Sequence, residues 1–279
     1  MADGNFSNDA FQPAQIARRV ESMGVTKAKA SVLTILLLAV LAGAFISLGA
    51  NFFIVVTTEN SELGFGVTRL LGGMSFSLGL VLVVIGGAEL FTGNNLLAMS
   101  WVSRLITTRS LLRHWGLAYL GNVLGCLTTV AIVACCDLDS LSGGAVGRTA
   151  IQIAQSKAEL GWGTVFFRGV LCNALVCLAV WLAMGGRTVS DKIMAIMFPV
   201  TAFVAMGLEH SIANWYFLPL GMLWDPDHTI SASGVIRNLI ASTLGNLAGG
   251  TLLVAGVYWM VYLRETNPPV ADSVCPSPK

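Results

Sequence analysis

Hydrophobic residues gather in six long runs along the chain, and short polar stretches separate the runs. They cover roughly residues 31 to 56, 68 to 103, 111 to 135, 160 to 185, 192 to 223 and 235 to 263. Because about 20 apolar residues are enough for an α-helix to cross a bilayer, each run predicts a transmembrane helix. The second and fifth runs are too long and too often interrupted for simple spans, so we expect broken helices there. The pattern predicts an all-α membrane protein with six transmembrane helices.

The chain also contains an internal repeat. Two strings recur at nearly the same separation: GGAELFTGN returns 120 residues later as GLEHSIAN, and LGNVLG at 120–125 returns as LGNLAG at 244–249. We therefore expect repeats over about 30–135 and 158–264. Three spans in each copy, an odd number, would turn the second copy upside down. An inverted 3+3 repeat of this kind places a substrate path near the membrane midplane, where the interrupted helices of the two halves meet.

Composition supports a membrane protein. The chain is 55% hydrophobic and only 11% charged, whereas soluble domains carry about 25% charged residues. We expect one transmembrane transport domain over 30–264, preceded by a polar cytoplasmic segment, 1–29, and followed by a disordered cytoplasmic tail, 265–279. Residues 1–29 have no apolar core before a cleavage site, which argues against a signal peptide. Within them, the stripe of Ile16, Val20 and Met23 predicts an amphipathic helix on the membrane surface.

The basic residues predict the orientation. If the N-terminus lies in the cytoplasm, 11 of the 16 basic residues face inside: Arg18, Arg19, Lys27, Lys29, Arg104, Arg109, Arg113, Arg187, Lys192, Arg264 and Lys279. The opposite face then holds Arg69, Arg148, Lys157, Arg168 and Arg237. The positive-inside rule therefore favours cytoplasmic termini in the cell inner (plasma) membrane. A net charge of +1 gives no footprint for nucleic acid.

Small residues indicate where helices touch. Gly121 and Gly125, and their repeat partners Gly245 and Gly249, form GxxxG spacings that allow close helix packing. The cysteines show no disulfide framework and no zinc-ligand spacing, so we expect no metal and no cofactor. We interpret five of them as small packing residues in or at the ends of apolar spans, namely Cys126, Cys135, Cys136, Cys172 and Cys177.

Three ionisable residues, Glu89, Glu209 and His210, lie inside the apolar runs, where such groups are costly and face a cavity or a partner. For the repeated pair Glu89 and Glu209 we favour a structural role, accepting hydrogen bonds from backbone N–H groups freed where a helix breaks. His210 is different because its counterpart in the first repeat is Leu90. The repeated scaffold does not require a histidine there, so His210 is the best candidate for function.

The strings AELFTG at 88–93, GVLCNALVCLA at 169–179 and GLEHSIAN at 207–214 resemble the signatures of the formate/nitrite transporter family, and the likeness extends from about residue 12 to residue 264. GVTRLLGG at 66–73 and FSLGL at 76–80 resemble the formate channels most, although AELFTG also occurs in nitrite-type members. The resemblance implies an aquaporin-like six-helix protomer in membrane lipid, a homopentamer, and one pore per protomer. The implied substrate is formate or a similar small anion, with nitrite, hydrosulfide, acetate and lactate as alternatives.

The resemblance also implies site residues, position by position. The family's pore residues match the central His210, Thr92 in the broken second helix, Asn246 in the sixth span, a cytoplasmic ring of Phe76, Leu80 and Phe203, an outer ring of Phe91 and Val176, and the vestibule Lys157. Structural roles at the helix breaks are expected for Glu89, Glu209, Asn94, Asn214 and Asn173. Without the resemblance, Lys157 would be a solvated loop charge, and Phe76 and Phe203 would be core aromatics.

Apolar rings favour the neutral acid over the bare anion. Moving a carboxylate-sized anion into a low-dielectric ring has an idealised cost on the order of 20 kcal/mol, and still several kcal/mol after relaxation. Protonating a carboxyl group of pKa near 3.5 at pH 7 costs only about 4 to 5 kcal/mol. We therefore expect proton coupling. His210, with an unperturbed imidazole pKa of about 6.5, could exchange the proton or only orient the substrate.

Other classes fit less well. With only three histidines, His114, His210 and His228, the chain offers neither an HExxH zinc site nor bis-histidine haem ligation, so we do not expect an enzyme. An aquaporin-type pore for neutral solutes shares the predicted shape, but it gives no reason for a histidine between two apolar rings. A receptor or scaffold would show no flux in liposomes.

Overall fold

The fold is known from a computed structural model, which describes residues 9–59 and 61–264. All regular secondary structure in these residues is helical: α1 Pro13–Ala28, α2 Val32–Thr57, η1 Ser61–Leu63, α3 Phe65–Gly86, η2 Gly93–Leu97, α4 Ala98–Val102, α5 Thr108–Ala134, η3 Leu138–Ser140, α6 Leu141–Glu159, α7 Trp162–Gly185, α8 Val189–Ala205, α9 Ser211–Trp224, α10 Ala232–Ala248, the π-helix η4 Gly249–Gly256 and α11 Val257–Tyr262. The expected tail and Cys275 lie outside the described residues.

Within the described part of the chain, five helices are long and apolar enough to cross a membrane: α2, α3, α5, α7 and the continuous stretch Ala232–Tyr262. The fifth apolar run of the sequence is divided between α8, with 17 residues, and α9, with 14 residues. Each part is shorter than the roughly 20 residues that span a bilayer. Together they supply the apolar length that a single helix supplies elsewhere.

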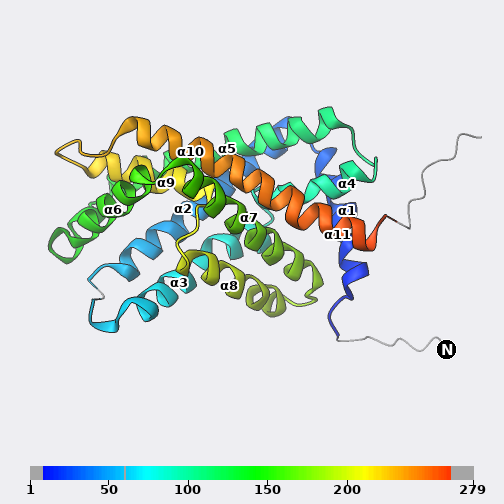
Figure 1. The fold of residues 1–279 in the computed structure, drawn as a ribbon, viewed down its shortest axis with the longest axis horizontal. Helices are drawn as coiled ribbons and strands as arrows, with labels where there is room; N and C mark the ends of the chain where they lie inside the picture. The colour runs from blue at the N-terminus through cyan, green and yellow to red at the C-terminus, as the bar shows by residue number, and fades with distance from the viewer. Residues whose placement is uncertain (1–8, 60, 265–279) are drawn as a thin grey trace, which may run out of the picture.

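The helices lie roughly along one long axis of the molecule, and the connections gather at its two ends (Figure 1). One end holds α6, the link from α2 to α3 and the link from α9 to α10. The opposite end holds α1, α4, the link from α7 to α8 and the end of α11. The two short helices α1 and α6, each of which precedes a long helix, therefore lie at opposite ends.

A glycine with a left-handed backbone stands at each interruption. Gly87 follows α3 with φ 77°, and Gly207 follows α8 with φ 69°. Non-glycine residues rarely adopt this conformation, whereas glycine does so without steric cost, so it is the usual residue where a helix stops. The two glycines are 120 residues apart, like the repeated strings that contain them. The repeat thus specifies both interruptions.

The GxxxG glycines are closely packed, as the sequence predicted. A Cβ on Gly125 would lie 2.1 Å from the Val40 carbonyl oxygen of α2, and a Cβ on Gly249 would lie 2.1 Å from the Val170 carbonyl oxygen of α7. Gly121 and Gly245 are similarly close to α2 and α7. No side chain could be added at these points without moving a helix.

The first helix differs from its prediction. Ile16 and Val20 of α1 were expected at a membrane surface, but they are buried in a cluster with Leu96 and Trp181. The same amphipathic stripe packs against apolar residues of the protein itself. In this position α1 can contribute polar side chains to the interior.

The cysteines follow the prediction in part. Cys126, Cys172 and Cys177 are buried, as small packing residues should be. Cys135 and Cys136 are exposed, because they follow the last turn of α5. Among the described residues all five are free thiols.

Candidate functional site

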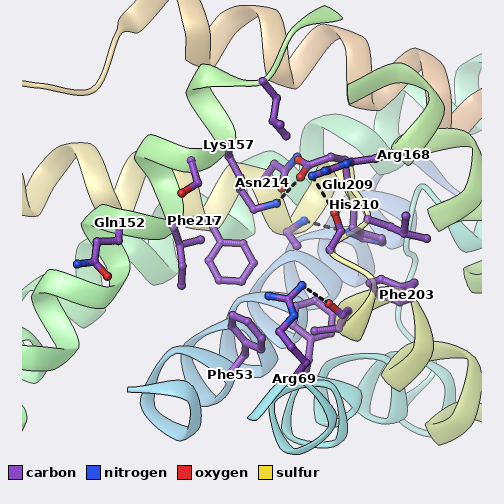
Figure 2. Close-up of a pocket in the computed structure, with 18 of the residues that line it drawn as sticks. Phe53, Arg69, Gln152, Lys157, Arg168, Phe203, Glu209, His210, Asn214 and Phe217 are labelled. Carbon is purple, nitrogen blue, oxygen red and sulfur yellow. Dashed lines mark hydrogen bonds and ion pairs between the residues drawn. The ribbon is translucent and has the colours of Figure 1, made fainter. Parts of the chain in front are cut away.

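A cavity of about 300 Å³ runs between α6, α8 and α9, with Lys157 and His210 both in its lining (Figure 2). Aromatic rings line it, among them Phe76, Phe203 and Phe217. Phe76 and Phe203 meet edge to face with ring centres 5.8 Å apart. The cavity therefore joins a charged mouth to a buried aromatic region.

His210 occupies the interruption between α8 and α9, and its ring is fixed on both sides. Its Nδ1 accepts a hydrogen bond from Ala213 N at 3.0 Å, which caps the start of α9. Its Nε2 lies 2.9 Å from Thr92 Oγ1. Since an accepting Nδ1 carries a lone pair, this geometry assigns the neutral tautomer with the proton on Nε2. The ring also stacks on Phe203 at 6.0 Å.

Asn246, which the resemblance matched to a pore residue, binds backbone groups next to His210. Its Oδ1 accepts from Ser211 N at 2.8 Å, and its Nδ2 donates to Gly169 O and Glu209 O, both at 2.9 Å. Asn246 thus satisfies the backbone exposed by the interruption. Because Nδ1 of His210 already accepts from Ala213 of α9, the contact with Thr92 is the other polar contact of the imidazole among the described residues.

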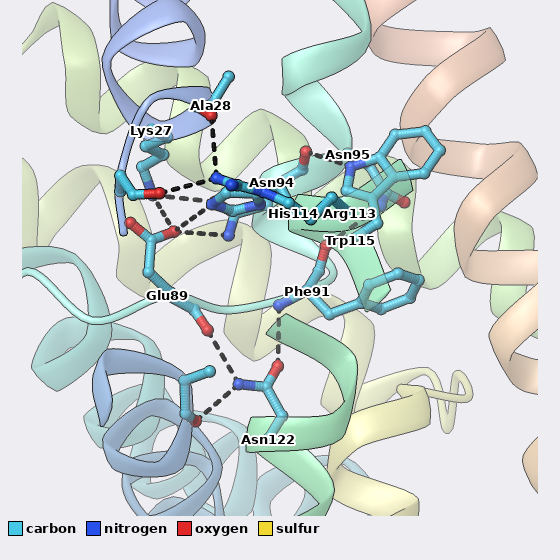
Figure 3. A network of polar contacts seen from close by, with 12 residues as sticks. Lys27, Ala28, Glu89, Phe91, Asn94, Asn95, Arg113, His114, Trp115 and Asn122 are labelled. Carbon is cyan, nitrogen blue, oxygen red and sulfur yellow. Dashed lines mark hydrogen bonds and ion pairs between the residues drawn. The ribbon is translucent and has the colours of Figure 1, made fainter. Parts of the chain in front are cut away.

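The repeat partner Asn122 makes the same three contacts in the other half. Its Oδ1 accepts from Phe91 N at 2.8 Å, and its Nδ2 donates to Ala39 O at 2.8 Å and Glu89 O at 2.9 Å (Figure 3). Each asparagine therefore links an interruption to a long helix: Asn122 bonds to α2 and Asn246 bonds to α7. The expectation that the glutamate carboxylates accept from freed backbone N–H groups was wrong, because asparagine amides perform that task.

The two glutamate carboxylates instead bind side chains. Glu209 accepts from Lys157 Nζ at 2.9 Å and Asn214 Nδ2 at 2.8 Å. Glu89 accepts from Lys27 Nζ at 2.9 Å and Asn94 Nδ2 at 2.7 Å (Figure 3). Both carboxylates are nearly inaccessible to solvent, so each buried charge has a cationic partner, as buried charges require. We call these the Lys157 pair and the Lys27 pair.

Lys157 and Lys27 end matching helices, α6 and α1. Lys157 is therefore an ordered component of the site and not a free loop charge. Lys27 was counted in the sequence only as a basic residue near the first span. The sequence did contain a signal for Lys27. The dipeptide Lys-Ala occurs in both copies, at 27–28 and 157–158, just before the first long apolar run of each copy.

A second cavity, of about 210 Å³, is lined by the polar residues Lys27, Glu89 and Asn94 and by apolar residues that include Leu80 and Leu90. Leu80 was predicted to share a ring with Phe76 and Phe203, on the side away from Lys157. The structure separates them, because Phe76 and Phe203 line the Lys157 cavity. Phe76 and Leu80 are about one helical turn apart on α3, yet they line different cavities.

Phe91 and Val176, the other predicted ring, are buried in the hydrophobic core. The Phe91 ring packs edge to face on Tyr119 at 5.1 Å. Asn173, predicted to act at a helix break, links η2 to α10, because its Nδ2 donates to Asn95 Oδ1 at 2.8 Å and to Asn246 O at 2.7 Å.

Two arginines belong to the Lys157 cavity although the sequence offered no reason to select them. Arg69 donates to Ala205 O at 3.0 Å and Val204 O at 2.8 Å, which caps the end of α8. Arg168 donates to Gly207 O at 3.4 Å and also lines the cavity (Figure 2). Arg69 binds the end of α8, which is 136 residues away in sequence, so local sequence patterns could not identify its role.

The sequence profile of the family described as "Formate/nitrite transporter" matches residues 14–260. The chain belongs to the formate/nitrite transporter family. It is 37% identical to "Formate channel FocA" of Escherichia coli (strain K12), over 95% of this chain and 99% of that protein. It is 35% identical to "Probable formate transporter" of Methanothermobacter thermautotrophicus, over 91% and 97%.

Solved structures of the formate/nitrite transporter family have the same fold. A structure described as "Pentameric formate channel with formate bound" matches with a TM-score of 0.75 and 36% identity, over 84% of this chain and 98% of that one. A structure described as "FNT family ion channel" matches with a TM-score of 0.81 and 27% identity, over 88% and 98%. The cavities described above therefore lie in a channel fold of an integral membrane protein.

Proposed function

We propose that this chain is a channel or transporter for formate and related small monovalent weak-acid anions, and not an enzyme. The observation that carries this proposal is the cavity that joins Lys157 to the His210–Thr92 pair through an aromatic lining. Among the described residues, three cations line this cavity, Lys157, Arg69 and Arg168, against one carboxylate, Glu209. A concave surface with excess positive charge concentrates small anions. The relatives named for formate support the same substrate.

We infer that six spans form an inverted 3+3 repeat. In this arrangement α3 with η2 and α4 is the second span, and α8 with α9 is the fifth. The matched contacts of Asn122 and Asn246 support an equivalence of the two halves, and the placement of α1 and α6 at opposite ends supports inversion (Figure 1). With the basic α1 end inside, both termini lie in the cytoplasm and the Lys157 cavity opens outward.

The proposed transport step follows from charge. An anion is attracted to the Lys157 ammonium, then loses its hydration as it passes Phe76 and Phe203. At that point the neutral acid crosses more readily than the anion, because burial penalises the charged form. The proton accompanies the substrate, which couples flux to pH.

His210 acts in this step as an orienting group. Its neutral ring uses Nδ1 to cap α9 and holds its proton on Nε2 beside Thr92. To act as an acid it would first have to accept a proton at Nδ1, and that would break the cap. We therefore assign the proton to solvent and the hydrogen bond to the Thr92–His210 pair.

Formate uptake into proteoliposomes tests the proposal. Purified protein should conduct formate by stopped-flow assay, and the rate should rise as the external pH falls from about 7 to about 5, because the neutral acid becomes more abundant. Nitrite, hydrosulfide, acetate and lactate in the same assay rank the alternatives. No formate flux above empty vesicles at either pH would refute transport. Glycerol and water flux without anion flux would instead indicate an aquaporin-type pore.

A further inference from the structure

His114, on α5, is buried directly behind the Lys27 pair and has no role in the pathway described above. Its side chain has no solvent exposure, and its Nε2 lies 3.5 Å from Glu89 Oε2 (Figure 3). Within residues 9–59 and 61–264, neither ring nitrogen has a hydrogen-bond partner. Buried polar atoms are nearly always hydrogen-bonded, so an imidazole in this state needs an explanation.

The repeat provides a direct comparison, because the residue matched to His114 is Asn238. Both lie eight positions before the asparagine that supports an interruption, Asn122 or Asn246. Asn238 is fully bonded: its Nδ2 donates to Lys157 O at 3.0 Å and Glu209 Oε2 at 3.1 Å, and its Oδ1 accepts from Asn214 at 2.8 Å. A carboxamide does not titrate. The two otherwise matched sites therefore differ by one titratable group.

Few charges surround His114. Four elements that pack on this part of α5 contain no charged residue in their described ranges. These elements are α2, α4, α9 and η2. The interruption contributes Glu89, and α1 contributes Lys27 and, six residues earlier, Glu21. On α5 itself, Arg113 donates to Ala30 O at 2.7 Å. The nearest charge to the ring is thus the Glu89 carboxylate.

One oxygen of that carboxylate already serves two donors. Glu89 Oε2 accepts from Lys27 Nζ and from Asn94 Nδ2. A protonated His114 would be a third donor and a second cation on this oxygen. The net charge of Lys27, Glu89 and His114 together would then rise from zero to plus one.

We propose that His114 is a positioning residue for the Lys27 pair. Protonation of His114 lets its ring form an ion pair with Glu89 Oε2, 3.5 Å away, and this weakens the interaction of that oxygen with Lys27. The Lys27 ammonium, which lines the second cavity, then becomes available to an anion there. The proton comes from water on the Lys27 side and binds one ring nitrogen, and no other bond changes. This inference rests on the proposed anion transport.

The consequence is a difference between the two faces of the protein. Acidification on the Lys27 side should increase anion capture from that side beyond the effect of forming more neutral acid. Acidification on the Lys157 side should act only by forming more neutral acid, because Asn238 cannot bind a proton. His114 would thus favour export of anions when acid accumulates at the Lys27 face.

Membrane vesicles of both orientations test this difference. Formate uptake is measured at source-side pH 7.5 and 5.5, and the ratio of the two rates gives the acid stimulation on each face. His114→Asn, which introduces the repeat-matched side chain, should lower the acid stimulation about threefold or more on the Lys27 face, about 0.7 kcal/mol at the tenfold-per-1.4 kcal/mol conversion. On the Lys157 face, the acid stimulation of formate uptake by His114→Asn should equal that of the unaltered protein. Asn238→His should raise stimulation on the Lys157 face.

The control variant is His228→Asn. His228 lies on an exposed loop with φ 50°, a conformation that asparagine tolerates, and its stimulation should be unchanged on both faces. Equal acid stimulation of His114→Asn and the unaltered protein on the Lys27 face would overturn the proposal. If His114→Asn does not assemble, His114→Gln replaces it.

A second measurement does not depend on transport. In protein with ¹⁵N-labelled imidazoles, the three histidine signals can be assigned by single substitution. The His114 signal should change from neutral to cationic between pH 8 and pH 5. A single protonation state across this range would also overturn the proposal. If no formate flux occurs at all but His114 titrates, the proposed function fails while the proton-binding role of His114 stands.

Discussion

The His210 side chain performs two tasks with two nitrogen atoms. Nδ1 caps α9 and Nε2 meets Thr92, so the ring belongs both to the scaffold and to the pathway. A substitution that removes both tasks cannot separate them. Asparagine can, because it is a favoured N-cap residue but is too short to reach Thr92 in the same way.

We expect His210→Asn to assemble and to melt close to the unaltered protein, whereas His210→Phe should lose about 1 kcal/mol through the missing cap. Both variants should strongly reduce formate flux or change its pH profile, since both lose the contact to Thr92. Thermal unfolding in detergent and proteoliposome flux are the measurements. His228→Phe, on the exposed loop, should change neither. An assembled His210→Asn variant with the original rate and pH profile would contradict the orienting role.

At the scale of helices, glycine contacts determine how close α5 lies to α2. Gly125 has no room for a Cβ against Val40 O, but Gly116, also on α5, has no atom within 4 Å of that position. The two glycines therefore form a matched pair for substitution.

Gly125→Ala should destabilise the fold by about 1 to 3 kcal/mol, because the new methyl group forces α2 away. Gly116→Ala should be neutral or stabilising by up to about 1 kcal/mol, since alanine is the better helix former. Melting temperatures in detergent provide the comparison. Equal melting temperatures for the two variants would mean that α2 and α5 are not held at the distance described here.

The elements also show what the sequence could predict. Gly87 and Gly207, where α3 and α8 end, lie inside the strings that the sequence repeats. The family resemblance assigned Thr92 and His210 to the pore, and the structure brings them within 2.9 Å of each other. The Lys27 pair was not predicted, because α1 was assigned to a membrane surface and Glu89 is 62 residues away. The separation of Phe76 from Leu80 was also missed, because Phe76 lines the Lys157 cavity and Leu80 lines the second cavity. One helical turn separates the two residues, and apolar periodicity does not show where along α3 the two cavities divide.

At the scale of the whole molecule, a wide band of large apolar side chains is exposed on the single chain, including Leu33 on α2 and Leu252 in η4. Lipid or neighbouring protomers must cover such a surface. One of the similar solved structures is described as a pentameric formate channel, which supports a pentamer here. In that assembly each protomer would conduct through its own cavities and the central axis would not conduct.

We therefore expect native mass spectrometry to report a complex of about 147 kDa, five copies of a 29.4 kDa chain. The complex should persist in mild detergent, because packing of small and apolar residues holds membrane helices together. A stable trimer or tetramer would exclude the homopentamer. Flux that is retained when the central axis is blocked would agree with one pathway per protomer.

The matched polar contacts have a consequence for biosynthesis. Lys27, Glu89 and Asn122 bind one another or shared backbone within the first half of the chain, and Lys157, Glu209 and Asn246 do so within the second. Chains emerge from the ribosome N-terminus first. The first buried charge can therefore be neutralised before the second half is translated. The Thr92–His210 contact, which joins residues 118 positions apart, forms last, so the centre of the pathway closes only when both halves are complete.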